Sequence, residues 1–238
     1  MHRIAAIVPA FDEAPDIERV VRELLALDPP PQVFVVDDGS SDDTGERAAR
    51  AGARVLRLPF NCGIGAAVQT GLRAALEGDF TAMVRLDGDG QHDPADMPRL
   101  LAALADGADF VLGSRHLEGD GYQTSRSRRL GIRWFTLLLR SLCGLRVSDP
   151  TSGFWAATPR TAAVLVSEAA SDYPEVDSLI HLWRAGLAIR EVPVRMRPRT
   201  AGQSSIGGLG SFYYMLKVSV ALLAARLGPR TQEAQPRP

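Results

Sequence analysis

Short apolar runs alternate with amphipathic segments through the first half of the chain. The runs are Ile4–Val8, Val33–Val36, Arg54–Leu58 and Thr81–Leu86. Between them, apolar residues recur at helical spacing in Asp16–Leu27, Asp42–Ala51 and Gly65–Glu77. A fifth strand is expected at Phe110–Leu112, after a helix that begins at Pro94 with Asp93 as its cap. This order predicts an α/β fold with a mostly parallel central sheet and helices on both faces.

The pattern changes beyond Gly113. Arg126–Gly144 reads as a basic amphipathic helix, Phe154–Ala157 as a short strand, Glu175–Ala185 as a helix and Ile189–Val194 as a strand. We expect residues 1–208 to form one catalytic domain, 209–227 a C-terminal amphipathic helix that faces a membrane or a partner, and 228–238 a disordered tail. The most apolar stretch, Phe212–Leu227, contains Lys217 and Arg226, so no membrane span is expected.

Composition and charge narrow the functional classes. The 238 residues are 45% hydrophobic and 23% charged, which is typical of a folded globular chain. The formal net charge of -1 gives no reason to expect nucleic acid as a partner. Cys62 and Cys143 form neither a spaced metal pair nor a disulfide framework, which fits a reducing cytosolic environment.

Polar residues follow four of the predicted strands at the point where each strand ends. Val8 leads into Pro9–Glu13, Val36 into Asp37–Ser40, Leu58 into Pro59–Gly63 and Leu86 into Asp87–Gln91. The carboxyl ends of parallel strands lie along one edge of a sheet, and ligands bind there in open α/β sheets. The sequence therefore predicts one binding site built from acids, amides and glycines of four separate strands.

The candidate metal site is Asp87-Gly88-Asp89, with Gln91 just beyond it. Carboxylates two residues apart in an irregular loop can face one ion, and their hard oxygen atoms suit Mg²⁺ or Mn²⁺. Such an ion would bridge a diphosphate and offset charge that develops on a leaving group. The alternative for the triplet taken alone is a polar turn, and its position at a strand end favours the metal site.

Two other segments are candidates for contacts with a nucleotide. Ser41 or Asp42 is expected to cap the next helix, which leaves Asp37 and Asp38 to accept hydrogen bonds from a base or a ribose. Asn61–Ala67 is a helix start punctuated by glycines, for which a simple N-terminal turn is the stronger interpretation.

Six segments together carry a resemblance to a known family. They are Pro9–Glu13, Val35–Asp42, Asp87–Pro94, Gly113–Arg115, Asp149–Phe154 and Arg199–Ser205. In this order they resemble the inverting family 2 glycosyltransferases, and more narrowly the polyprenol-phosphate (dolichol-phosphate mannose synthase-like) branch. The resemblance extends over residues 3 to 206.

The resemblance implies a GT-A fold, the fold of nucleotide-diphospho-sugar transferases, and a role for each matching residue. The resemblance implies that Pro9, Glu13 and Asp38 bind the nucleotide sugar, and the strand-end positions add the candidates Phe11, Asp37, Asn61, Gly63, Asp87 and Gly88. The candidate metal ligands are Asp87, Asp89 and Gln91. The candidates for catalysis are Asp89, Arg115, Asp149 and Asp177. The candidates for binding the acceptor or a phosphate are Arg115, Arg128, Arg199 and Ser204, because guanidinium groups suit phosphate oxygens.

The implied reaction is an inverting transfer of a sugar from a UDP- or GDP-sugar to a polyprenyl phosphate, either dolichyl or undecaprenyl phosphate. A phosphate acceptor is already anionic and needs little help from a base. Asp149 would then orient the sugar or the acceptor loop, or cap its own turn. Asp177 would contact sugar hydroxyls. A hydroxyl acceptor on a glycan, glycolipid or small metabolite would need one of these acids as its base, and both acceptors stay open.

A nucleotidyltransferase is disfavoured as an alternative. Such an enzyme also uses paired acids, a metal ion and a nucleotide pocket, but it would carry a glycine-rich phosphate loop and a basic residue after the first strand. Pro9–Glu13 stands there instead.

A basic segment raises the question of a membrane. Between Arg115 and Arg146 there are seven arginines against two acids, a local charge of +5, and Trp134 and Phe135 lie among them. A helix of this kind can lie in an anionic headgroup layer, and a core-packed helix with a solvated arginine face is the alternative. A polyprenol acceptor favours a peripheral protein at the cytoplasmic face of the plasma membrane. A small membrane partner protein and a homo-oligomer are further open alternatives.

Overall fold

The computed structural model describes residues 3–117, 126–167, 174–197 and 219–220. The side chains of residues 126–128, 174, 175 and 177 lie outside that description, as do the rest of the predicted C-terminal helix 209–227 and the tail. Within the described residues, no helix is both long and apolar enough to cross a bilayer.

The described strands form one seven-stranded sheet in the order β3-β2-β1-β4-β6-β5-β7. Their bounds are β1 Ile4–Ala10, β2 Gln32–Asp37, β3 Arg54–Arg57, β4 Ala82–Arg85, β5 Phe110–Ser114, β6 Trp155–Ala157 and β7 Ile189–Pro193. β6 runs antiparallel to its neighbours β4 and β5, and the other paired strands run parallel. The predicted mostly parallel sheet is therefore confirmed.

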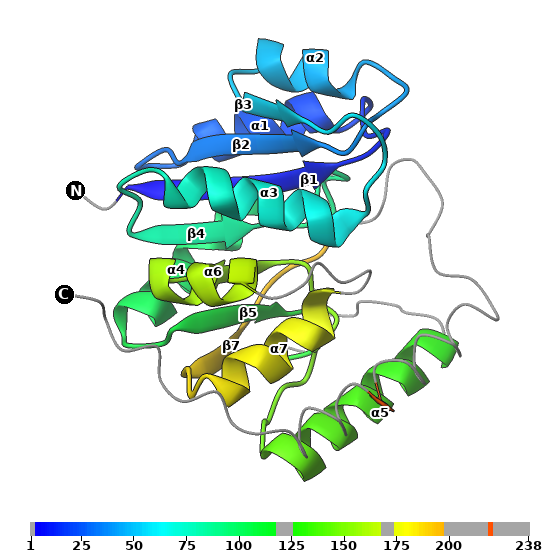
Figure 1. Ribbon diagram of the computed structural model, residues 1–238, viewed down its shortest axis with the longest axis vertical. Coiled ribbons are helices and arrows are strands. Elements are labelled where there is room, and N and C mark those ends of the chain that lie inside the picture. The colour runs from blue at the N-terminus through cyan, green and yellow to red at the C-terminus, as the bar shows by residue number, and fades with distance from the viewer. Residues whose placement is uncertain (1–2, 118–125, 168–173, 198–218, 221–238) are drawn as a thin grey trace.

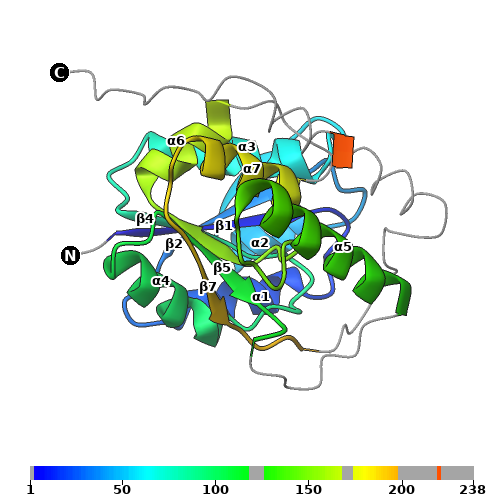
Figure 2. The ribbon, with the colours of Figure 1, turned by 90° about the horizontal axis from the view of Figure 1, so that it is seen from below.

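Helices cover both faces of this sheet. Their bounds are α1 Ile17–Leu25, α2 Thr44–Arg50, α3 Ile64–Leu76, α4 Met97–Ala105, α5 Arg126–Cys143, α6 Pro159–Ser167 and α7 Pro174–Arg184, with a 3₁₀ turn η1 at Pro94–Asp96. Figures 1 and 2 show α1 and α4 on one face and α3, α6 and α7 on the other. Asp93 caps η1 as expected, since its side chain accepts the N–H of Ala95 at 3.1 Å.

Each face of the sheet has its own apolar core. Leu24, Val35 and Leu100 belong to the cluster under α1 and α4, whereas Leu72 and Leu179 belong to the cluster under α3, α5, α6 and α7. Strands buried on both faces read as continuous apolar runs, which is why the sequence pattern located them well. Helix α6 was not predicted.

Because β1 to β4 and β5 run parallel, their carboxyl ends lie along one edge, at the right of Figure 1. The segment leading into the antiparallel β6 enters at that same edge. The residues predicted to converge from separate strands are therefore delivered to one side of the molecule.

Candidate active site

The loops that follow β1 and β2 are joined by hydrogen bonds. Ser41 donates its backbone N–H to Asp12 Oδ1 at 2.8 Å, and Asp12 donates its own N–H to Ser40 Oγ at 3.0 Å. Glu13 N–H donates to Thr44 Oγ1 at 2.9 Å. Asp12 adopts a positive φ of 53°, a conformation that Asp tolerates better than most residues. The two loops thus form one wall at the sheet edge.

The buried carboxylate of Asp38 fixes a third loop against this wall. Its oxygens accept the N–H groups of Cys62 at 2.8 Å and Gly63 at 2.9 Å, so Asp38 caps the start of α3. Gly39 allows the close approach: at its φ of +73°, a Cβ would lie 2.5 Å from the carbonyl carbon of Phe60. The carboxylate that was expected to contact a nucleotide therefore also organises the loop.

Asp37 is wholly buried and held inside the β2 loop. Its Oδ1 accepts the N–H of Ser40 at 2.9 Å, and Oδ2 lies 3.3 Å from Arg57 Nε. The N-cap of α2 is Asp43, not Ser41 or Asp42 as expected, although Asp42 accepts the N–H of Thr44, the first residue of that helix, at 3.0 Å. Asp37 shapes its loop in this structure.

Exposed aromatic rings flank the same region. Phe11 follows β1 and Phe60 follows β3, and both side chains are exposed. Asn61 accepts the N–H of Gly63 at 3.0 Å, and Pro9 is buried in β1. Apolar rings beside a few fixed polar groups are typical of sites for small molecules and cofactors.

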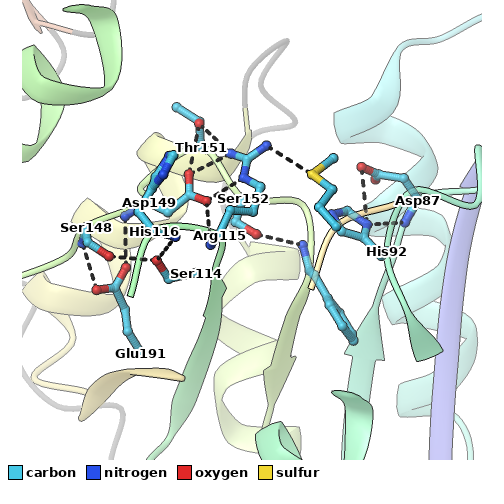
Figure 3. A network of polar contacts seen from close by, with 12 residues as sticks. Asp87, His92, Ser114, Arg115, His116, Ser148, Asp149, Thr151, Ser152 and Glu191 are labelled. Carbon is cyan, nitrogen blue, oxygen red and sulfur yellow. Dashed lines mark hydrogen bonds and ion pairs between the residues drawn. The ribbon is translucent and has the colours of Figure 1, made fainter. Parts of the chain in front are cut away.

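Asp87 follows β4 and is held by three neighbours, of which Figure 3 shows His92. Arg85 Nη2 donates to its Oδ1 at 3.0 Å. His92 Nδ1 accepts its backbone N–H at 3.2 Å, and a Cβ on Gly153 would lie 2.7 Å from its Oδ2. Burial alone would raise the pKa of Asp87, but Arg85, His92 and Arg115 together outweigh it and hold that pKa below its usual value. The carboxylate is thus ionised and its orientation is set.

The neighbouring residues complete the loop after β4. Asp89 is buried and accepts the N–H of Gln91 at 3.0 Å. Gly88 packs tightly, since a Cβ there would lie 3.2 Å from the Cβ of Ala10. Burial lowers the pKa of His92, which matches its role as an acceptor at Nδ1. The described residues hold no cluster of three or more His, Cys, Asp or Glu side chains with metal-binding geometry.

This chemistry fits a divalent ion that binds together with a ligand. Mg²⁺ is commonly held by one or two carboxylates and completed by substrate phosphates and water rather than by a full protein cage. Asp87 provides an ionised carboxylate that is 32% exposed. Asp89 lies two residues away in the same loop. The donor set is incomplete without further oxygen ligands, as expected where a diphosphate supplies them.

Beyond the loop that carries Asp87 and Asp89, Arg115 and Asp149 form a buried ion pair. Arg115 Nη2 lies 2.6 Å from Asp149 Oδ1, and Nε lies 2.5 Å from Oδ2, so the contact is bidentate. Arg115 Nη2 also donates to Thr151 Oγ1 at 3.1 Å. Burial would raise the pKa of Asp149, but the bonds from Arg115 lower it overall. Two residues expected to contact substrate are therefore bound to each other.

Glu191 of β7 supports this pair from below (Figure 3). Its carboxylate accepts the N–H groups of Ser148 at 2.7 Å and Asp149 at 3.0 Å. Ser148 Oγ lies 2.7 Å from Ser114 Oγ, which links the segment to the end of β5. Burial raises the pKa of Glu191. The turn that carries Asp149 is thus anchored to two strands.

The segment after β7 contacts both the loop that follows β4 and helix α1. Met196 forms a β-bridge with His92, and the N–H of Arg197 donates to Gln91 O at 2.7 Å. The guanidinium of Arg197 lies 2.6 Å from Glu23 Oε2 and 2.8 Å from Asp93 Oδ1. The loop with the metal-ligand candidates is therefore tied directly to the segment that leads toward Arg199.

The structure brings most of the predicted residues to one edge of the sheet. Four lie outside its described side chains, namely Asp177, Arg128, Arg199 and Ser204. Sequence reasoning gave no role to Arg85 or Glu191. Arg85 carried a usable signal, because it is a charged residue at the end of an otherwise apolar strand.

Helix α5 has apolar side chains on two opposite faces. Ile132, Phe135, Leu139 and Cys143 are buried in the core. The opposite face exposes Leu130, Trp134 and Leu137, by 67%, 45% and 61%. Arg129, Arg133 and Arg140 are exposed beside them. Trp134 also donates to Ser219 Oγ at 3.1 Å. We call Leu130, Trp134 and Leu137 with these three arginines the α5 outer face.

A comparison with protein families identifies the chain. The model for glycosyl transferase family 2 matches residues 5–158, which include the loops after β1 to β5 and the turn at Asp149. The chain belongs to glycosyl transferase family 2. Membership accounts for the gathering of acids at the carboxyl ends of the strands, and this glycosyltransferase has the predicted GT-A fold.

Similar proteins cover nearly the whole glycosyltransferase. Undecaprenyl-phosphate mannosyltransferase of Micrococcus luteus is 32% identical over 87% of this chain and 88% of its own. Polyprenol monophosphomannose synthase of Mycolicibacterium smegmatis is 28% identical over 94% and 89%. Among solved structures, glucosyl-3-phosphoglycerate synthase of Mycobacterium tuberculosis with Mn²⁺, UDP and glucosyl-3-phosphoglycerate has a TM-score of 0.72 at 26% identity, covering 97% of this chain and 82% of that one.

Proposed function

We propose that this glycosyltransferase moves a sugar, with inversion, from a nucleoside-diphosphate donor to a polyprenyl phosphate. Relatives named for transfer to undecaprenyl phosphate and for polyprenol monophosphomannose synthesis align with it over most of both chains. The strand-end arrangement of the loops supports the same donor chemistry. The alignment over nearly the full length is the observation that carries the proposal.

The residues act on the donor as follows. The wall of Asp12, Glu13 and Asp38 with the ring of Phe11 would hold the nucleoside. Asp87 and Asp89, with Gln91 beside them, would hold Mg²⁺ or Mn²⁺, and the ion would supply positive charge for the departing diphosphate. The acceptor oxygen attacks the anomeric carbon on the face opposite the leaving group, which inverts the configuration.

The state of Asp149 favours a phosphate acceptor. A hydroxyl acceptor needs a base, whereas a phosphate oxygen is already a nucleophile. Both oxygens of Asp149 accept hydrogen bonds from Arg115, and the pKa of Asp149 is lowered. Such a carboxylate is a poor base. Asp149 therefore positions Arg115 and the turn at Thr151, and the anionic acceptor fits this arrangement.

A second candidate keeps the donor chemistry and changes the acceptor. A solved structure similar to this one, at a TM-score of 0.73, is a glucosyl-3-phosphoglycerate synthase in complex with phosphoglyceric acid. A hydroxyl on a small phosphorylated acid is therefore the alternative acceptor. It would require a base other than the paired Asp149.

The α5 outer face supports a peripheral position at a membrane that contains the lipid acceptor. Exposed leucines and a tryptophan can insert among acyl chains while neighbouring arginines contact anionic headgroups. The cytoplasmic face is the side where nucleotide sugars are available to such an enzyme.

A transfer assay with purified protein tests the proposal. UDP-glucose, UDP-galactose, GDP-mannose and dTDP-rhamnose are each paired with a short polyprenyl phosphate or with 3-phosphoglycerate, in Mn²⁺ or in EDTA. We expect a lipid-phosphate sugar that needs Mn²⁺ and is lost in Asp89→Ala. If a glycosylated product forms with 3-phosphoglycerate and not with the polyprenyl phosphate, the second candidate, a hydroxyl acceptor, is the correct one. Absence of metal-dependent binding of any nucleotide sugar would refute the donor chemistry.

A further inference from the structure

Arg85 is a charged residue in the middle of the sheet. It ends β4, is 1% exposed, and lies in register with Ile7 of β1 and Trp155 of β6. A guanidinium keeps its charge at any pH at which proteins fold, and burying it is costly unless anions compensate. Its place therefore requires a negative partner, and Asp87 is one such partner.

The contact between Arg85 and Asp87 is directional. Arg85 Nη2 engages Oδ1 of Asp87 at 3.0 Å, whereas Oδ2 lies 3.7 Å from His92 Nδ1 and accepts no hydrogen bond from the described residues. Gly153 packs against both oxygens and limits rotation of the carboxylate. Arg85 thus lies buried behind Asp87, and Asp87 is partly exposed in front of it. One oxygen is held by Arg85, and the carboxylate as a whole stays partly exposed to a ligand.

A fixed cation in this place has opposite effects on the two ligands of the site. It reduces the negative potential that Asp87 offers to a divalent cation, so the ion alone binds weakly. It attracts a diphosphate, and it also attracts the complex of a diphosphate with the ion, because that complex keeps a net negative charge. If the Arg85 guanidinium and a charged ligand at Asp87 are about 6 Å apart, with an effective dielectric constant near 20, their interaction changes the affinity for that ligand by roughly tenfold or more.

We propose that Arg85 is a positioning residue that makes metal binding depend on the nucleoside diphosphate. The ion binds weakly to the free protein and tightly together with the diphosphate of the donor. Arg85 fixes one oxygen of Asp87 and provides the buried positive charge that separates these two affinities. The inference rests on the proposed function only for the presence of a diphosphate in the donor.

Binding measurements without turnover test this inference. Mn²⁺ binding is followed by electron paramagnetic resonance for the wild type, Arg85→Met and Arg85→Lys, in the absence of nucleotide and with UDP or GDP. Arg85→Met should bind Mn²⁺ alone roughly tenfold more tightly and should bind the Mn²⁺–nucleotide complex, whose net charge is negative, roughly tenfold more weakly. Arg85→Lys keeps the charge and should stay close to the wild type. Arg54→Met, which removes an exposed arginine on β3, is the matched control.

The outcomes separate the proposals. If Arg85→Met weakens Mn²⁺ binding equally with and without nucleotide, Arg85 only shapes the carboxylate and the inference is wrong. Unchanged affinities in both conditions overturn it as well. If Arg85→Met does not fold, Arg85→Gln carries the test, because Gln keeps a donor but loses the charge. A wild type that binds neither UDP nor GDP contradicts the proposed function, whereas the Mn²⁺-only comparison still tests the charge of Arg85.

Discussion

Gly153 gives a sharp test of how Asp87 is held. A Cβ at this position would lie 2.7 Å from Oδ2, 2.9 Å from Oδ1 and 3.1 Å from Cγ of Asp87, so its three nearest atoms all belong to one side chain. Gly153→Ala would place Cβ about 0.7 Å inside the 3.4 Å at which ordinary contact begins. Asp87 cannot swing away freely because Arg85 holds its Oδ1 at 3.0 Å.

The expected cost follows from this overlap. Overpacking a buried site costs about 1–3 kcal/mol. Removal of the Asp87 side chain removes all three contacts, and Ala in place of Gly at a compatible conformation then stabilises by about 0.4–1 kcal/mol through the unfolded chain. The φ of Gly153 lies outside the left-handed region. Gly153→Ala should therefore destabilise the wild type and stabilise Asp87→Ala, with a coupling energy of roughly 1.5–4 kcal/mol.

Urea unfolding of four proteins measures this cycle: the wild type, the two single variants and the double variant. Tryptophan fluorescence reports the transition. Thermal unfolding followed by the same fluorescence should show the melting temperature of Gly153→Ala lowered by about 2–4 °C per kcal/mol. Mn²⁺ affinity in the presence of UDP or GDP should fall by about 10- to 100-fold in Gly153→Ala, since a side chain that orients a ligand is displaced. Equal destabilisation in both backgrounds would show that Asp87 is not the residue that Gly153 accommodates.

Three further outcomes are expected. Asp149→Asn should lose about 3–5 kcal/mol of stability at neutral pH, because it leaves Arg115 buried without its anion. The folded pKa of Asp149 is lowered, so its contribution to stability is present above about pH 4 and is lost as the pH falls through the folded pKa. In urea titrations the difference in unfolding free energy between the variant and the wild type should therefore narrow toward about pH 3. A difference in unfolding free energy that does not change with pH would contradict this role of the Asp149 carboxylate. Asp38→Ala should cost about 0.5–2 kcal/mol by uncapping α3 and should weaken nucleotide binding in calorimetry, whereas unchanged stability would show that the cap contributes nothing. Changing Leu130 and Leu137 to Ser should lower flotation with anionic vesicles about tenfold at unchanged thermal stability, and full retention would remove the α5 outer face from the membrane contact.

The sequence located the strands well because their apolar runs are buried on both faces, and the loops at their ends followed from the parallel order. The antiparallel direction of β6 was not predicted, since a three-residue strand carries no signal of its direction. Helix α6 was missed. It begins at Pro159 directly after that strand, where no polar loop marks a new element.

Within the site, residue types were easier to predict than their partners. Asp38 was expected to face a nucleotide, and it also caps α3 through two backbone groups 24 and 25 residues away. Arg115 and Asp149 were each expected to face substrate, and they bind each other across 34 residues of sequence. Such pairings depend on the order of strands in the sheet, which periodicity does not encode. The burial of Arg85 likewise depends on β6, which pairs with β4 and makes it an inner strand of the sheet.

The links around His92 bear on how donor and acceptor are coordinated. His92 contacts the Asp87 backbone through Nδ1, packs on Phe154 with ring centroids 5.3 Å apart, and forms the bridge with Met196. Arg115 Nη1 lies 3.8 Å from Met196 Sδ, so the buried Arg115–Asp149 pair contacts the same segment. The loop that carries Asp87 is therefore joined to the segment after β7 through the backbone pairing of His92 with Met196. The candidate metal ligands and the buried Arg115–Asp149 pair are in this way connected through the segment that contains Met196.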